Sequence, residues 1–327
     1  MKKTVYYIFT LLLILHLCCY WVKLEGIIAV LTSLYMPICF AFFFRRIDVF
    51  EQESWKDIVL VFIVSCITLL IYSPFIGFVH SAFDLPDEIG NASFLQMLFA
   101  VAIPEEIIKI IPVLIILKTT KFINEPIDYI IYSSISALGF AFIENIQYIS
   151  SMLDQDMNII AIRSFFPTLM HMCTTSIIGY QIYKYQKQSN SLKKSHLLYI
   201  ILAFFLASIG HAMYNLLGIW ILLILCGYYA SNIKETLKDS PFINKTNIDD
   251  ELNTQTSVTN SGYNSFYIYM IFGVLLMDII FGYINNGVLN LDILSSLVII
   301  IILFSIIINS ALDKSEVKQI WKKIAKK

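Results

Sequence analysis

The sequence predicts an all-α protein, a polytopic bundle of about nine or ten transmembrane helices. Of the 327 residues, 58% are hydrophobic and only 14% are charged, whereas soluble domains average about 25% charged residues. Several continuous apolar runs reach the ~20 residues that a helix needs to cross a bilayer. The lipid bilayer is therefore the expected surroundings. A net charge of −1, without a basic arm, gives no support for a nucleic-acid partner.

The spans are expected near residues 4–22, 26–44, 58–80, 94–117, 129–150, 160–183, 264–286 and 290–311, with the run 197–230 crossing once or twice. Lys and Arg gather at alternate connections, which indicates a cytoplasmic N-terminus and a multi-pass protein of the cell membrane, as in bacteria. The C-terminal tail is rich in Lys, so a cytoplasmic tail favours two crossings of 197–230 and ten spans. One crossing would give nine.

Five regions are expected along the chain. A three-span region at 1–93 precedes a membrane core at 94–230, a polar loop at 231–263, a two-span region at 264–312 and a basic tail at 313–327. The loop shows no apolar periodicity, which predicts a flexible segment and not a second domain. All six cysteines lie in apolar runs, so they are expected to be buried small side chains without a disulfide framework.

The stretch AIPEEIIKIIPVLIIL, residues 102–117, places three ionisable side chains inside an apolar run. Inserting three charges near the centre of a span into the bilayer costs about 8–10 kcal/mol together. The apolar residues of the run 94–117 favour insertion by only about 5–9 kcal/mol. The charged face must therefore lie inside a bundle or a wet cavity. An ionisable residue in that position is first of all a candidate for function.

The spacing brings these three groups to one helical face. Glu105 and Lys109 are four residues apart and Glu106 and Lys109 are three apart, so the lysine can reach either carboxylate. If the helix breaks at Pro104, both glutamates fall in a first turn, where the helix dipole favours their ionised forms. The alternative is an internal ion pair that only orders the bundle.

Three further spans carry matching groups. Residues 138–148 contain Glu144 with Asn145 beside it and Tyr148 one turn on, His171 lies in the middle of the next span, and His211 and Asn215 share a face further along. A single histidine inside a membrane protein is usually a packing residue. Several spans with such groups favour one shared polar site, because each group can then satisfy another.

Two histidines with carboxylates can perform hydrolysis in two ways. Imidazole and carboxylate are usual ligands of catalytic zinc, and a further carboxylate can take a proton from the attacking water. Without a metal, a glutamate can activate the water while an amide of Asn145 or Asn215 donates to the oxyanion. Two other classes are open: a proton-coupled transporter, which often shows an internal repeat, and a non-catalytic scaffold or immunity protein.

These blocks, in this order, resemble the PrsW family of intramembrane proteases. The family pattern of EExxK, GFAxxEN with a following Tyr, a histidine-containing span and HxxxN or HxxxD is matched by 105–109, 139–148, 163–179 and 211–215. The approach EPIDYIIYSSISALGF, with Asp128, is also similar to the family. The resemblance covers roughly residues 94–217 and extends more distantly to type II CAAX-prenyl proteases and bacteriocin-processing enzymes.

The resemblance implies an endopeptidase, commonly classed as a metalloprotease, that cleaves a membrane-anchored protein. In well-known members the substrate is an anti-sigma factor, which implies a role in signalling. It also implies roles by position: Glu105 or Glu106 activates water, Lys109 tunes them and Asn215 stabilises the oxyanion. The expected ligands of a Zn²⁺ ion are Glu144, His171 and His211.

Overall fold

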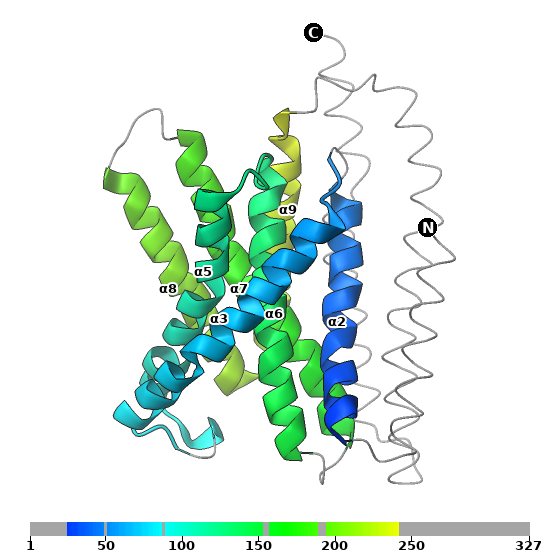
Figure 1. Ribbon diagram of the computed structural model, residues 1–327. Coiled ribbons are helices and arrows are strands. Elements are labelled where there is room, and N and C mark those ends of the chain that lie inside the picture. The colour runs from blue at the N-terminus through cyan, green and yellow to red at the C-terminus, as the bar shows by residue number, and fades with distance from the viewer. Residues whose placement is uncertain (1–24, 49–50, 87–88, 153–156, 189–193, 242–327) are drawn as a thin grey trace.

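The computed structural model describes residues 25–48, 51–86, 89–152, 157–188 and 194–241, and the statements below concern these residues (Figure 1). Within them the chain is helical and contains no strand, which confirms the predicted all-α class. The expected spans 4–22, 264–286 and 290–311 lie outside the described residues, as does the basic tail.

The long helices are α2 (Glu25–Ile47), α3 (Trp55–Ala82), α5 (Ile103–Thr119), α6 (Pro126–Met152), α7 (Met157–Gln188), α8 (Lys194–Leu217) and α9 (Trp220–Lys238). Between α3 and α5 lie a 3-10 turn at Ile89–Asn91, the short helix α4 (Phe94–Gln96) and the π-helix η2 (Met97–Ala102). A capping box starts α4. The side chain of Ser93 accepts a hydrogen bond from the backbone N–H of Gln96, and the side chain of Gln96 accepts one from the backbone N–H of Ser93.

Helices α6 and α7 form the centre of the bundle, and each packs against most of the other long helices. Figure 1 shows α3 running diagonally across α6, with α2 beside α6 and α8 on the side of α5. In the most apolar window of α6, 89% of the residues are buried, against 28% for α3. Helix α6 is therefore an inner helix, and α3 presents much of its apolar surface outward.

A glycine allows the close crossing of α3 and α6. A Cβ atom at Gly139 would lie 2.5 Å from the backbone oxygen of Phe62 and 2.8 Å from the Cβ of Ser65. Ser65 also donates a hydrogen bond of 2.5 Å to the backbone oxygen of Ser136 on α6. Gly139 therefore permits the close approach of the two helices.

Three of the described helices are long and apolar enough to cross a membrane: Trp55–Ala82, Pro126–Ser150 and Leu198–Leu217. Ala29–Arg45 is a shorter apolar helix. The expected span 94–117 is not a single α-helix, because it changes from π-helix to α-helix at Ile103. The α-helical part carries three ionisable residues. The total of nine or ten spans stays a prediction.

The apolar run 197–230 is divided into two helices. Helix α8 ends at Leu217, Gly218 has φ +72°, and α9 starts at Trp220. Glycine suits this turn because side chains disfavour a positive φ. Figure 1 shows α9 running back along the bundle after this turn, which is the hairpin arrangement expected for two crossings.

Residues 231–238 of the expected polar loop belong to α9, which continues to Lys238. Residues 242–263 of that loop lie outside the described residues. Asn232 and Thr236 are buried against the bundle. Glu235 pairs with Lys184 and accepts a hydrogen bond from Tyr180. These contacts with α7 hold the polar segment as a helix, and composition alone could not show them.

Candidate active site

Helix α5 delivers the two adjacent glutamates through a change of helical type. Ala102 keeps right-handed helical angles, φ −63° and ψ −48°, and the N–H of Ile103 bonds to the oxygen of Leu98 in the π-helical pattern. The predicted break at Pro104 is therefore a π-to-α junction and not a free helix end. Junctions of this kind are frequent at functional sites, but the first-turn dipole argument for Glu105 and Glu106 does not apply here.

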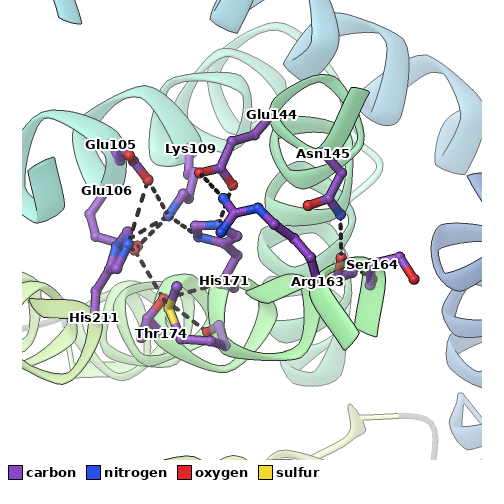
Figure 2. Close-up of polar contacts among 12 residues, drawn as sticks. Glu105, Glu106, Lys109, Glu144, Asn145, Arg163, Ser164, His171, Thr174 and His211 are labelled. Carbon is purple, nitrogen blue, oxygen red and sulfur yellow. Dashed lines mark hydrogen bonds and ion pairs between the residues drawn. The ribbon is translucent and has the colours of Figure 1, made fainter. Parts of the chain in front are cut away.

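Glu106 is the most heavily bonded carboxylate of the site (Figure 2). Its Oε1 atom lies 2.8 Å from the Lys109 ammonium and 3.0 Å from His211 Nδ1. The hydroxyl of Thr174 donates to Oε1 at 2.9 Å, and that of Thr175 donates to Oε2 at 2.8 Å. With no exposed surface and these partners, Glu106 fixes its neighbours and has no room to accept a substrate.

The Lys109 ammonium lies at the centre of the cluster. It is 2.8 Å from Glu106 Oε1, 3.6 Å from Glu105 Oε2 and 2.5 Å from Nδ1 of His171. The ring of Phe140 covers it at 4.6 Å. The expected contact of Lys109 with both glutamates is therefore present, and the lysine also reaches a histidine from another helix.

His171, from α7, links the cluster to Glu144 on α6. Its Nε2 atom lies 2.8 Å from Glu144 Oε2. Glu144 is also 3.4 Å from the guanidinium of Arg163, which stacks 3.4 Å above the ring of Tyr148. Arg163, at the start of its span, thus belongs to the edge of the site.

His211, from α8, faces both glutamates of α5. Its Nδ1 atom is 3.0 Å from Glu106 Oε1, and its Nε2 atom is 3.6 Å from Glu105 Oε2. The rings of His171 and His211 meet edge to face, with centroids 5.0 Å apart. Both histidines are 1% exposed, so the two imidazoles are enclosed within the bundle.

The three side chains whose ligand atoms converge are Glu105, His171 and His211. One ligand atom from each lies within 4.8 Å of the others, and all three residues are buried. The sequence-based set had Glu144 in place of Glu105. Glu144 instead contacts Nε2 of His171. This contact suits a carboxylate that orients a metal-binding histidine.

This group has the donor chemistry of a metal centre. Each histidine contacts a carboxylate through one nitrogen, His171 through Nε2 to Glu144 and His211 through Nδ1 to Glu106. Ligating histidines characteristically have such partners. Glu105 Oε2 is buried and has no hydrogen-bond partner among the described residues. These are the donor types that bind a zinc-like divalent cation. The His171 nitrogen left for a metal is Nδ1, which the Lys109 ammonium contacts at 2.5 Å, so Lys109 would have to move for a cation to bind.

The asparagines of the sequence motifs lie apart from this centre. Asn145 is buried, and its amide donates to Thr168 Oγ1 at 3.0 Å, which ties α6 to α7. Asn215 is half-buried one turn beyond His211 on α8, and the described contacts do not join it to the cluster. Gly179 also has a packing role, because a Cβ there would collide with Ser133 of α6.

Sequence analysis missed Thr174 and Thr175, which both donate to Glu106. Their signal was present, since they follow His171 by three and four residues and so share its helical face. His80, near the end of α3, was not among the residues that the sequence predicted for the site. The structure places it in the lining of a cleft that also contains Glu105 and Glu144.

A second group of carboxylates lies near the connections that precede α3 and α6. Asp48, Glu53 and Asp128 are buried and offer ligand atoms within 4.8 Å of one another. Backbone N–H groups of Glu51 and Glu53 donate to Asp48, and Tyr132 donates to Glu53. Asp128, which lies in the segment similar to the family, is only 1% exposed.

The fold and the site define a class: a helical membrane protein with a buried carboxylate–imidazole centre. Comparison with known proteins narrows this class. A family model described as PrsW family intramembrane metalloprotease matches residues 53–232. The chain belongs to that family.

A relative in Oceanobacillus iheyensis, named Protease PrsW, is 30% identical over 125 residues. The matched region is 38% of this chain and 55% of the relative, so the chain spans about half the length of the curated relative it matches. No solved structure matches the chain.

Proposed function

We propose that this protein is an intramembrane endopeptidase that cleaves a membrane-anchored protein. The observation that carries the proposal is the convergence of Glu105, His171 and His211 from three helices at one buried point beside a cleft. Family membership supports the same reaction class. The proposed place of action is the cell membrane, with the N-terminus on the cytoplasmic side, as the distribution of Lys and Arg favours.

In this proposal Glu105, His171 and His211 hold a divalent cation, with zinc as the expected ion. A cation bound there would polarise the scissile carbonyl and increase the acidity of the attacking water. Glu106 and Glu144 orient the imidazoles of His211 and His171 through the contacts described above.

We assign to Glu144 the role of general base, which accepts a proton from the attacking water. This carboxylate lines the cleft, whereas Glu106 is enclosed by its four partners. Glu144 is also within 3.4 Å of Arg163, which supports its ionised form. The sequence-based assignment of this role to Glu105 or Glu106 is thus replaced by a proposal in which Glu105 is a ligand.

Lys109 supplies positive charge beside the donors of the proposed centre. Its ammonium contacts Glu105, Glu106 and His171. The proposed role is to hold Glu106 in its buried, ionised form, so that Glu106 can orient His211. Asn215 has no contact that supports the oxyanion role expected from the sequence.

The test uses the purified protein in lipid vesicles with a set of synthetic single-span peptides. Each peptide carries a fluorophore and a quencher on either side of the outer third of its span. The native protein is expected to cleave at least one peptide, and Glu105→Gln is expected to abolish measurable cleavage, because the variant lacks one of the three proposed ligands. The matched control is Glu51→Gln, an exposed carboxylate before α3, which should retain the native rate.

Two results would contradict the proposal. One is equal cleavage by the native protein and by Glu105→Gln. The other is a folded native protein that cleaves none of the peptides, which would favour a non-catalytic scaffold or immunity protein. An anti-sigma factor enters only as a later candidate substrate, because nothing in the described residues selects it.

A further inference from the structure

A cleft of about 290 Å³ lies between α3, α5 and α6, next to the proposed centre. Leu69, Ile76 and Phe140 give it apolar walls, and Glu105 and Glu144 contribute carboxylates. Ser73 and His80 of α3 complete much of its rim. The cleft is thus the described opening in which a substrate would meet two carboxylates of the site.

A backbone carbonyl inside an α-helix is bonded within that helix. A stretch of a transmembrane substrate whose carbonyl groups bond to this cleft has therefore left its helical form and lies extended.

His80 is a polar group without a partner in this cleft. Its Nε2 atom is buried and makes no hydrogen bond with any described residue. A buried polar atom left in this state destabilises the fold unless a ligand satisfies it. An extended peptide exposes backbone carbonyl groups that a helix would satisfy internally, and such a carbonyl is a suitable acceptor for an imidazole N–H.

We propose that the substrate lies in this cleft next to the bond that is cleaved, and that His80 donates its Nε2–H to a backbone carbonyl of that stretch. His80 is thus a substrate-binding residue outside the metal-ligand set. The inference rests on the proposed protease function, and it adds the side chain that holds the substrate backbone.

The location is tested by disulfide cross-linking in a cysteine-free variant that also carries Glu105→Gln. Ser73→Cys, in the cleft, is compared with Ile71→Cys, which is 66% exposed on the outer side of α3. The probes are the single-span peptides with one cysteine moved along the outer third. We expect cross-links from residue 73 at a few neighbouring peptide positions, at least tenfold above those from residue 71.

Equal cross-linking at the two positions, or none at residue 73, overturns the inference whether or not the peptides are cleaved. The two proposals therefore fail separately. Cleavage without a cross-link at residue 73 refutes binding in the cleft and supports the protease function. A selective cross-link at residue 73 without cleavage by the native protein supports binding in the cleft and refutes the protease function.

The role of His80 is tested by kinetics in an otherwise native protein. His80→Leu should raise KM for a cleaved peptide about tenfold, with kcat changed less than threefold and bound metal unchanged. His80→Gln should restore KM to within about threefold, because its amide can donate from a similar position, whereas a purely structural role would show equal effects on both variants. A loss confined to kcat, or an unchanged KM in His80→Leu, would refute the role.

Discussion

The ammonium of Lys109 lies 2.8 Å from Oε1 of Glu106, and neither side chain has any exposed surface. Buried ion pairs of this kind are strongly coupled, since removing one partner leaves an uncompensated charge. We therefore expect Lys109→Met to lower the free energy of unfolding by about 3–5 kcal/mol. Thermal unfolding in detergent, with helix content as the signal, measures this loss.

The double variant Lys109→Met/Glu106→Gln provides the control. It also removes the negative charge of Glu106, which the single variant leaves buried without a partner. The double variant should therefore recover more than half of the lost free energy of unfolding. Losses that simply add in the double variant would show that the two side chains do not stabilise each other.

The crossing of α3 and α6 at Gly139 predicts a second effect on stability. Gly139→Ala should destabilise the protein by about 2 kcal/mol or more, because the new Cβ would lie 2.5 Å from the Phe62 backbone oxygen. It should also reduce cleavage, since α6 carries Glu144 and α3 lines the cleft.

Gly77→Ala on α3 is the matched control, because a Cβ at that position has no neighbour within 4 Å. Alanine is the better helix former by about 1 kcal/mol, so Gly77→Ala should be neutral or stabilising. Similar unfolding temperatures for the two variants would refute close packing at Gly139.

The carboxylate group around Asp48 predicts a dependence of stability on pH. Burial, then the nearby carboxylates of Glu125 and Glu53, raise the pKa of Asp48 to about 8. In the unfolded chain the pKa is about 3.9. Between these values the folded state holds a proton that the unfolded state has lost. Stability therefore falls as pH rises from about 4 to about 8, by up to about 1.4 kcal/mol per pH unit.

Asp48→Asn should reduce this slope by up to about 1.4 kcal/mol per pH unit, because the amide stays uncharged over the whole interval while the other carboxylates of the group still titrate. Denaturant unfolding of the native protein and of the variant at several pH values between 4 and 8 measures the difference. Glu51→Gln, at an exposed position, serves as the control and should keep the native slope. An unchanged slope in Asp48→Asn would contradict the raised pKa.

The sequence was sufficient to identify most of the helices that meet at the site. Charges inside apolar runs have few stable positions, so Glu105, His171 and His211 were expected to meet, and they do. Two crossings of 197–230 were one of two expected outcomes, and the turn at Gly218 agrees with that one. These predictions rest on the high free energy of charged and unsatisfied polar groups in a bilayer, which does not depend on how the helices pack in detail.

Other features depend on packing between helices and could not be read from one chain segment. The exchange of Glu144 for Glu105 in the converging group depends on the angles at which α5, α6 and α7 cross. The position of His80 in the cleft depends on the diagonal path of α3. The extension of α9 to Lys238 depends on contacts of Glu235 with α7, which local composition does not encode.

The most direct test of the account is the metal content of the purified native protein and two matched variants, Glu105→Gln and Glu144→Gln. The account predicts about one zinc ion per chain in the native protein, loss of that ion in Glu105→Gln, and its retention in Glu144→Gln together with loss of peptide cleavage. Loss of zinc in Glu144→Gln and its retention in Glu105→Gln, or a folded and active native protein without bound metal, would contradict the proposed centre.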